Sequence, residues 1–366
     1  MLSHTDCIII GSGIAGLTTA LRLREAGFSV TVLEREQLGR EASWAGGGIL
    51  CPLYAWRYPE PVMRLAAAGM ARYPSLIEEL RCKQTTDPEF YKSGLLIVDP
   101  IQTPHEAAQI TAWATHYQYP HQWQAAEAHF SHLPHQKALW LPDINTVRNP
   151  RLLHALMAAV RQAGVRLLEH QPAQKLLIQN NRILGVQSDN TTHSAERVII
   201  TAGAWSGGLV PGLSPAQIFP VRGQMIRFEP APAPGLHTIL MDQGIYLIPR
   251  QDGSVVVGST VEHVGFDKRT TEEAIAHLHR KAVALWPNLA RNAIAQQWSG
   301  LRPSTQDEIP YIGAHPEIEG LWVAAGFYRN GLAMGPAVAE ILTNLITGRP
   351  AIMDLTDYRL DRPALF

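Results

Sequence analysis

The feature that most constrains the fold of this chain is a glycine-rich turn set between an apolar strand and a helix. An apolar run at residues 7–10 leads into the turn GSGIAG at 11–16, and apolar residues then recur at helical spacing until Gly27. A second apolar run at 30–33 ends in Glu34. Strand, turn, helix and strand in this order predict a Rossmann-type dinucleotide site built on buried parallel strands, rather than a chance glycine-rich turn.

Each position of the turn has its own physical role. Gly11 permits the tight turn, Gly13 lets the backbone approach a pyrophosphate, and Gly16 lets the helix and the strand pack closely. The helix N-terminus supplies amide donors and a positive dipole. Glu34 can accept hydrogen bonds from ribose hydroxyls, and its charge would repel a 2′-phosphate. The predicted cofactor contacts at the start of the helix are Ile14 and Ala15.

The segment after Glu34 favours FAD over a nicotinamide dinucleotide, a choice that the glycine motif leaves open. A nicotinamide-binding domain normally continues with another regular βα unit, whereas here the polar, glycine-rich segment GREASWAGGGILCPLY follows from residue 39. We expect this segment to follow FAD from the ribose toward the isoalloxazine; the alternative is a flexible surface loop. The residues in and just before it that are predicted to bind FAD are Arg35, Arg40, Ser43, Trp44, Gly46, Gly47 and Gly48.

Composition narrows the class of protein. The 366 residues suffice for about two domains, and a net charge of −1 gives no field to attract nucleic acid or an acidic membrane. Three cysteines without a C-x-x-C pair suit a reducing compartment. No secretory signal is visible, and no apolar run reaches the roughly 18 to 20 residues of a spanning helix. We expect a cytoplasmic homo-oligomer with no integral membrane segment and no nucleic-acid partner.

A histidine-rich stretch near the middle of the chain does not predict a metal site. It has no cysteine and no ligand spacing of a known zinc frame, so we expect a solvated surface and no bound metal. Its histidines are His116, His121, His129, His132 and His135.

Eight segments together carry a more specific signal than any single motif. They are IIIGSGIAGLTTALRL, REASWAGGGIL, NTVRNPRLL, VIITAGAWSG, PVRGQMI, YLIPRQDGSVVVGST, GLRPSTQDEIPYIG and AAGFYRNGLAMGPAVAEIL. In order and spacing, over essentially the whole chain, this set resembles the D-amino-acid oxidase family of FAD-dependent amine oxidases. The resemblance is strongest to the branch that oxidises glycine and supplies an imino acid for the thiazole ring of thiamine.

The resemblance implies an α/β fold in which a Rossmann-type FAD-binding domain is interleaved with an antiparallel-sheet α+β substrate domain. The implied segments are 1–85, 146–218 and 297–366 for the FAD-binding domain, and 86–145 and 219–296 for the substrate-binding domain. The residues themselves support part of this. Residues 198–201 read as another parallel strand that ends at Ala202-Gly203, and Asp252-Gly253 joins two β-runs as a hairpin.

The resemblance also implies an anchor for a substrate carboxylate. In it, Arg302 of GLRPS pairs with the carboxylate, Tyr246 of GIYLIPR adds a phenol, and Arg329 of GFYRNG supports the carboxylate or closes the site. Without the family context, a surface salt bridge from Arg302 to Asp307 or Glu308 is the simpler interpretation. Tyr246 taken alone is equally explained as a packed core tyrosine.

The other implied site residues follow the same family pattern. Ile49, Cys51 and Leu53 are candidates for limiting the size of the substrate side chain. The aromatic segment 51–61 either lines the pocket or packs between domains. Covalent flavin attachment in related enzymes uses a C-terminal cysteine, which is missing here, so we expect noncovalent FAD. The further cofactor residues are Val147, Ala202, Gly203, Trp205, Gly300, Arg302, Arg329, Asn330, Gly331 and Leu332. The pattern departs from this branch at Phe327, where histidine is usual, and at Ala333-Met334.

Three functions remain open at this stage. The favoured one is FAD-dependent oxidation of glycine and other small amines or D-amino acids (sarcosine, D-alanine, D-proline), with hydride transfer to flavin N5 and O2 reduced to H2O2; it requires no acid–base side chain. The second is a quinone-linked D-amino-acid or imino-acid dehydrogenase, with an exposed apolar patch at residues 54–59. The third is a non-enzymatic flavin-binding redox sensor, which the retained Tyr246 and Arg302 oppose. One methyl group changes discrimination by only about 1–3 kcal/mol, so the substrates are not ranked.

Overall fold

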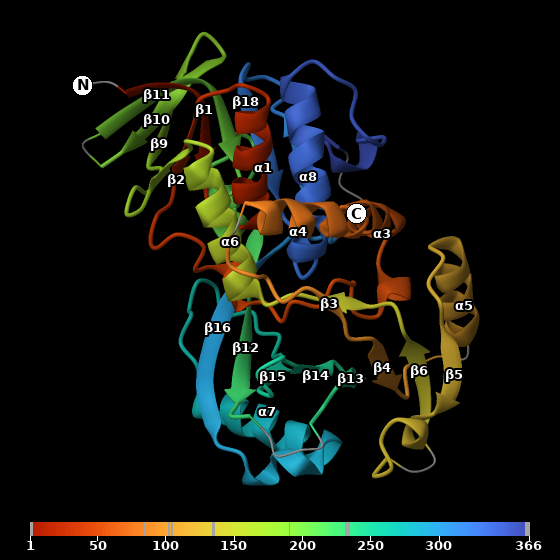
Figure 1. Ribbon diagram of the computed structural model, residues 1–366. Helices are drawn as coiled ribbons and strands as arrows, with labels where there is room; N and C mark the ends of the chain where they lie inside the picture. Colours follow the sequence, from red (N-terminus) through yellow and green to blue (C-terminus); the bar gives the residue numbers. More distant parts are fainter. Residues whose placement is uncertain are drawn as a thin grey trace.

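The computed structural model of this chain describes residues 3–83, 85–101, 103, 105–133, 136–189, 191–230 and 235–362. Within these residues, two eight-stranded sheets form the two halves of the molecule, which lie one above the other in Figure 1. A two-stranded ribbon of β3 (Tyr91–Lys92) and β7 (Asn145–Thr146) lies between the halves.

The first sheet is the predicted Rossmann-type sheet. Its strands are β17 (Tyr311–Ala314), β18 (Leu321–Ala325), β11 (Thr191–Ile200), β1 (Ser3–Ile10), β2 (Val30–Leu33) and β8 (Arg166–Leu168), in that order, with β9 (Lys175–Gln179) and β10 (Arg182–Ser188) added beside β11. The pairs from β18 to β8 are parallel, and all four residues of β2 are buried, as expected of a strand covered on both faces. Ile10 lies beside both Leu33 and Ile200, so three strands end together at one edge.

Helices cover this sheet and bury its apolar side chains. They are α1 (Ile14–Glu25), α3 (Glu60–Met70), α4 (Tyr73–Cys82), α6 (Asn149–Gln162) and α8 (Gly331–Ile346). Figure 1 shows α1 and α8 side by side on the sheet, and α3 and α4 crossing below them toward the second half. Leu17, Leu21 and Leu23 of α1 are fully buried in this core.

The second sheet is almost entirely antiparallel. Its strands are β16 (Ile294–Ser304), β12 (Phe219–Phe228), β15 (Val255–Gly258), β14 (Ile245–Pro249), β13 (Ile239–Asp242), β4 (Leu95–Val98), β6 (Lys137–Leu141) and β5 (Gln122–Ala125), in that order. Only the pair β13–β4 is parallel. Helices α5 (Glu106–His116) and α7 (Glu272–Leu285) belong to this half, and β14 and β15 form the hairpin predicted around Asp252-Gly253.

The remaining elements are short. They are α2 (Ala42–Ala45) and the 3₁₀ turns η1 (Ala55–Arg57), η2 (Ala126–Ala128), η3 (Gly203–Gly208), η4 (Pro287–Arg291) and η5 (Thr356–Tyr358). Among the described residues, no helix is long and apolar enough to cross a membrane.

The chain alternates between the two sheets, which confirms the predicted interleaved fold. One predicted boundary differs from the strands. β16 pairs with β12 along its whole length, from Ile294 opposite Phe228 to Ser304 opposite Phe219. Residues 297–304, which the sequence assigns to the FAD-binding domain, therefore belong to the second sheet, because their backbone hydrogen bonds are made there.

Candidate active site

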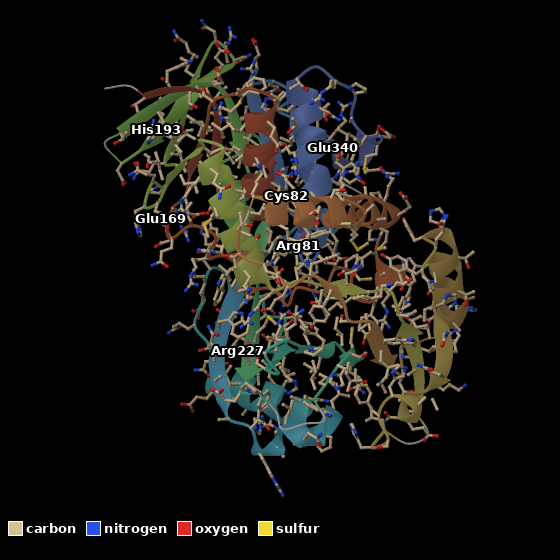
Figure 2. All side chains as sticks on the ribbon, in the orientation of Figure 1. Arg81, Cys82, Glu169, His193, Arg227 and Glu340 are labelled. Atoms are coloured by element: carbon tan, nitrogen blue, oxygen red, sulfur yellow. The ribbon has the colours of Figure 1, made fainter. Side chains whose placement is uncertain are left out.

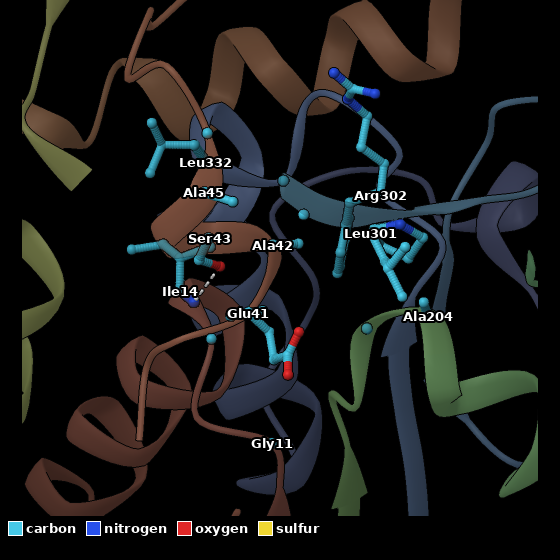
Figure 3. Close-up of a pocket in the computed structure, with 18 of the residues that line it drawn as sticks. Gly11, Ile14, Glu41, Ala42, Ser43, Ala45, Ala204, Leu301, Arg302 and Leu332 are labelled. Atoms are coloured by element: carbon cyan, nitrogen blue, oxygen red, sulfur yellow. Dashed lines mark hydrogen bonds between the residues drawn. The ribbon is translucent and has the colours of Figure 1, made fainter. Parts of the chain in front are cut away.

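A cavity of about 390 Å³ lies at the edge of the first sheet where β1, β2 and β11 end, and it reaches the face of the second sheet. This volume is in the range of small-molecule sites. Glu34 and Gln171 line the cavity beside the first sheet, and Tyr246 and Arg302 line it beside the second. Figure 3 shows Gly11 and Arg302 on opposite sides of the view. The site is thus assembled between the two halves.

The turn after β1 leaves no room for a side chain at Gly11 or Gly16. Gly11 has φ +104°, and its amide donates to the Leu33 carbonyl at 2.8 Å. A β-carbon on Gly16 would lie 2.0 Å from the Gly11 carbonyl oxygen and 2.7 Å from Thr201 Oγ1. These contacts bring the start of α1 directly against the strand ends, as the motif predicts.

The N-terminus of α1 opens toward the cavity. Its capping position is Gly13, which supplies no side-chain acceptor. Instead, the Ile14 amide donates to Ser43 Oγ at 3.0 Å (Figure 3), and Ser43 comes from α2 in the predicted cofactor segment. Free amides and a positive dipole at a helix N-terminus suit a phosphate group.

The end of β2 carries a fixed carboxylate. Glu34 is 8% exposed, and its Oε2 accepts hydrogen bonds from the amide and the hydroxyl of Ser12, at 3.0 and 2.6 Å. The guanidinium of Arg35 lies 3.8 Å from the ring centroid of Trp205, a cation–π contact at the cavity wall. A carboxylate held in this position can accept ribose hydroxyls, so together the bare turn, the helix N-terminus and Glu34 fit a dinucleotide.

Arg302 lies on β16 at the other side of the cavity. Its Nη1 donates to the carbonyls of Arg222 and Thr260, at 3.2 and 3.1 Å, and its Nη2 donates to Ser259 Oγ at 2.6 Å. Burial lowers the pKa of Arg302 and neighbouring Tyr246 opposes this effect, but a guanidinium stays charged at physiological pH.

Within the described part of the chain, Arg302 forms no ion pair with a carboxylate. Asp307, the suggested surface partner, pairs with Arg362 at 3.1 Å instead. Among the described residues Glu308 forms no ion pair with Arg302 either, so the alternative interpretation of Arg302 as an ordinary surface salt bridge to Asp307 or Glu308 is wrong. A charged fork that lines a cavity without a carboxylate partner is suited to binding an anionic ligand.

A second cation, Arg329, lines the same part of the cavity. Its buried Nε has no hydrogen-bond partner among the described residues, and its guanidinium carbon lies 5.3 Å from the Tyr328 ring centroid. Burial acts to lower the pKa of Arg329, but the phenols of Tyr328 and Tyr58 outweigh it and raise the pKa. The phenol of Tyr246, which is 7% exposed and also lines the cavity, acts to raise the pKa of both arginines, so the three residues lie close together.

The wall beside these arginines is mainly apolar. Ile49, Cys51, Leu53, Met225 and Phe327 line it. Burial raises the pKa of the Cys51 thiol to about 12, so this residue contributes a neutral surface at physiological pH. The three cysteines are all free, and Cys82, at the end of α4 in Figure 2, is exposed. Met334 is fully buried in α8 and does not line the cavity.

Three predicted cofactor residues lie outside the cavity wall. Gly16 faces the Gly11 carbonyl and the Thr201 side chain, as its packing role requires. The Trp44 ring turns away to meet Arg40, at 4.5 Å from guanidinium carbon to ring centroid, and Trp298, at 6.0 Å between centroids. Val147 is fully buried behind Gly48, and its carbonyl accepts a hydrogen bond from Arg250 at 3.0 Å.

The remaining predicted site residues line the cavity. They are Gly11, Gly13, Ile14, Ala15, Glu34, Arg35, Arg40, Ser43, Gly46, Gly47, Gly48, Ile49, Cys51, Ala202, Gly203, Trp205, Tyr246, Gly300, Arg302, Arg329, Asn330, Gly331 and Leu332. Sequence reasoning missed Ser12, Gln171, Pro172, Ala173, Met225 and Ser259. The segment 171–173 could have been found, because it follows β8, whose short apolar run is the third parallel strand beside β2.

Two further expectations concern regions outside the cavity. The segment 54–59 is no exposed apolar patch, since Tyr54 and Ala55 are buried and Arg57 pairs with Glu106 at 2.5 Å. Among the described residues, no group of three His, Cys, Asp or Glu side chains could hold a metal ion. His135 of the histidine-rich stretch lies outside the described residues.

Two interleaved sheets with a dinucleotide turn on one and a ligand-binding cation on the other define a class of two-domain, dinucleotide-dependent oxidoreductases. Within that class, the chain belongs to the FAD dependent oxidoreductase family, whose family model matches residues 6–345. FAD is therefore its cofactor, and the predicted class, an FAD-dependent amine oxidase of the D-amino-acid oxidase family, is confirmed.

Individual relatives extend the match over nearly the whole chain. A glycine oxidase of Pseudomonas aeruginosa is 39% identical over 96% of this chain and 97% of its own length. The bifunctional protein ThiO/ThiG of Synechocystis sp. is 32% identical over 94% of this chain, which spans 52% of that protein. The crystal structure of glycine oxidase from Geobacillus kaustophilus superimposes with a TM-score of 0.91 at 29% identity, and the match covers 99% of both chains.

Proposed function

We propose that this protein oxidises glycine and other small amines, such as sarcosine and small D-amino acids, and passes the electrons through FAD to O2 to give H2O2. The observation that carries the proposal is Arg302, a charged fork that lines the cofactor cavity without a carboxylate partner among the described residues. The names of the glycine oxidase relatives support the choice of glycine. The fusion of ThiO to ThiG in a relative supports a role in supplying iminoacetate for the thiazole ring of thiamine.

When bound, FAD supplies the acceptor for the hydride that leaves the substrate α-carbon. The protein's own contribution is orientation and exclusion of water. Arg302 binds the carboxylate through two parallel N–H donors, Tyr246 adds a phenol, and Arg329 adds a second positive charge. The apolar wall at Ile49 and Cys51 limits the substrate side chain. No side chain is assigned as a general acid or base.

Several finer features belong to the same proposal. The helix N-terminus of α1 and Glu34 would hold the pyrophosphate and a ribose of noncovalently bound FAD. Three free cysteines support a reducing, cytoplasmic location, and closed symmetry, the common case among oligomers, supports a homo-oligomer.

Anaerobic mixing of the FAD-loaded protein with glycine, sarcosine, D-alanine and D-proline tests this proposal. We expect at least one of them to bleach the flavin absorption band, and re-aeration to restore the band with release of H2O2. Bleaching without peroxide on re-aeration, together with reduction of a quinone, would replace the oxidase by the dehydrogenase alternative. A flavin that no small amine bleaches would contradict amine oxidation altogether.

A further inference from the structure

The face of the second sheet that borders the cavity has glycines on three adjacent strands. Gly300 of β16 lies directly opposite Gly223 of β12, and Gly258 of β15 lies opposite Met225 of β12 and Tyr246 of β14. Directly opposed residues in antiparallel strands share a face, so these glycines leave bare backbone beside Arg302 and Tyr246.

A positive φ does not explain these glycines, although the peptide bond from Gly258 to Ser259 is cis. Neither Gly223, Gly258 nor Gly300 has a positive φ, so an L side chain would fit the backbone at all three positions. Glycine inside a strand weakens it, and it commonly marks a place where another group approaches closely. The space above each residue offers a separate reason for glycine, because a β-carbon would be crowded at all three positions.

What fills that space differs from one glycine to the next. A β-carbon on Gly223 would lie 2.2 Å from Arg302 Nη2 and 2.4 Å from its guanidinium carbon. A β-carbon on Gly258 would lie 2.7 Å from the Tyr246 hydroxyl oxygen. A β-carbon on Gly300 would instead lie 2.4 Å from Cβ of Ala45, in the cofactor segment. The guanidinium and the phenol thus lie directly on glycine backbone.

We propose that Gly223 and Gly258 are positioning residues for the substrate carboxylate. Gly223 lets the Arg302 guanidinium lie flat on β12, where the Arg222 and Thr260 carbonyls and the Ser259 hydroxyl fix its orientation. Gly258 lets the Tyr246 hydroxyl lie on β15, one strand away. The two bare positions set the separation and the direction of the two groups that meet the carboxylate. This inference rests on the proposed function of Arg302 and Tyr246.

The first test is steady-state kinetics of Gly223→Ala and Gly258→Ala with bound FAD. Because a misplacement of about 1 Å can cost about 100-fold, we expect KM for glycine to rise about 10- to 100-fold, with a smaller change in kcat. Gly300→Ala is the contrasting variant, for which we expect weakened FAD binding instead. Gly235→Ala is the matched control, since among the described residues its β-carbon would meet only a ring carbon of His237, at 3.9 Å.

A double-mutant cycle separates positioning from general damage. If Gly223 acts through the guanidinium, Gly223→Ala has almost no further effect in the Arg302→Ala background. Full additivity of the two effects, or an unchanged KM in both Gly223→Ala and Gly258→Ala, would overturn the proposal. Circular dichroism and flavin content measure whether these variants still fold and bind FAD. Loss of folding or of FAD would also overturn the proposal, since the glycines would then have a structural role.

A nonreacting carboxylate keeps this test independent of turnover. Acetate bound at Arg302 should perturb the flavin absorption spectrum of the wild-type holoenzyme, and Gly223→Ala should weaken acetate binding by a similar factor of about 10 to 100. If no small amine is oxidised but acetate binding follows this pattern, the proposed reaction fails and the positioning role stands. If glycine is oxidised but acetate binds both proteins equally, the positioning role fails alone.

Discussion

Burial separates the three cysteines into two kinds of thiol. Desolvation raises the pKa of Cys7 and of Cys51 to about 12, whereas Cys82 is exposed at the end of α4. A raised pKa keeps the thiol protonated, and at pH 8 only about one buried thiol in 10,000 would be ionised. The thiolate is the reactive form, so Cys51 is protected both by its burial and by staying protonated.

We therefore expect a thiol reagent at pH 8 to label one cysteine per chain in the folded holoenzyme and three in denaturant. In the folded Cys82→Ser variant, the number of labelled cysteines per chain should be zero, as measured by mass spectrometry of the labelled protein. Labelling of Cys51 as fast as Cys82 would contradict a sealed apolar wall at this part of the cavity.

At the scale of single elements, helix α1 depends on its glycines for two separable reasons. A β-carbon on Gly16 would overlap the Gly11 carbonyl at 2.0 Å, whereas one on Gly13 would meet only Ser43 Oγ, at 3.0 Å. We expect Gly16→Ala to lose folded protein, and Gly13→Val to keep its circular dichroism but lose FAD, because the added carbons fill the space for the pyrophosphate. Gly13→Val with normal flavin content would show that the cofactor does not approach this turn.

The hairpin β14–β15 holds the cofactor segment through one buried guanidinium. Arg250 is 7% exposed and donates to the carbonyls of Gly47 at 2.7 Å and Val147 at 3.0 Å. Burial lowers the pKa of Arg250 to about 10, so it remains charged at neutral pH. One side chain of the second sheet thereby fixes two backbone groups next to the cavity.

Arg250→Met would leave these two carbonyls without donors, at a cost of about 1–3 kcal/mol each if water does not replace them. We expect a lower free energy of unfolding and about 10-fold weaker FAD binding, with part of the loss restored by Arg250→Lys. Flavin fluorescence, which reports the release of FAD, measures the change in FAD binding. The partly exposed Arg227 on β12 (Figure 2) gives the control, Arg227→Met, which should change FAD binding less than twofold. Equal effects of the two variants would contradict the role of Arg250.

The sequence predicts best those elements whose signal is local. β2 and the glycine turn into α1 follow from an apolar run, fixed glycine spacing and a stop at Gly27. Contacts made across the chain are not visible in this way. Val147 precedes α6 in a family motif, yet it is fully buried and only its backbone carbonyl lies against Gly48. Gln171 reaches the cavity because its backbone amide donates to the Glu34 backbone carbonyl at 2.8 Å.

The position of β16 and the role of the glycines beside Arg302 could not be predicted either, because both depend on contacts between residues that are distant in the sequence. The segment 294–304 contains proline and no regular alternation, so its membership of the second sheet follows only from its pairing with β12. Gly223 and Gly258 carry no turn signal, and their meaning depends on side chains from other strands that lie on them. Sequence reasoning identified Arg302 and Tyr246 through the family resemblance, but not the surface that supports them.

In the whole molecule, the two sheets contribute different residues to the site. The first sheet provides the dinucleotide turn and Glu34, and the second provides Tyr246 and Arg302. The chain crosses between them repeatedly, so neither half is a continuous segment. This arrangement predicts that binding of FAD and binding of the carboxylate can be impaired separately by single substitutions.

Arg302→Ala tests directly whether Arg302 binds the substrate carboxylate without contributing to FAD binding. Removing one partner of a buried charge pair costs about 2–5 kcal/mol, so kcat/KM for glycine should fall roughly 30-fold to several thousand-fold. Arg302→Lys should recover only part, and Tyr246→Phe should cost less, about 1–2 kcal/mol.

The decisive comparison is between glycine and methylamine, an amine without a carboxylate, on the wild-type and Arg302→Ala holoenzymes. We expect a large fall in kcat/KM for glycine, an already slow methylamine turnover that is nearly unchanged, and full FAD content in the variant. Normal glycine kinetics in Arg302→Ala, or loss of FAD and activity together, would contradict the role of Arg302 as the carboxylate anchor.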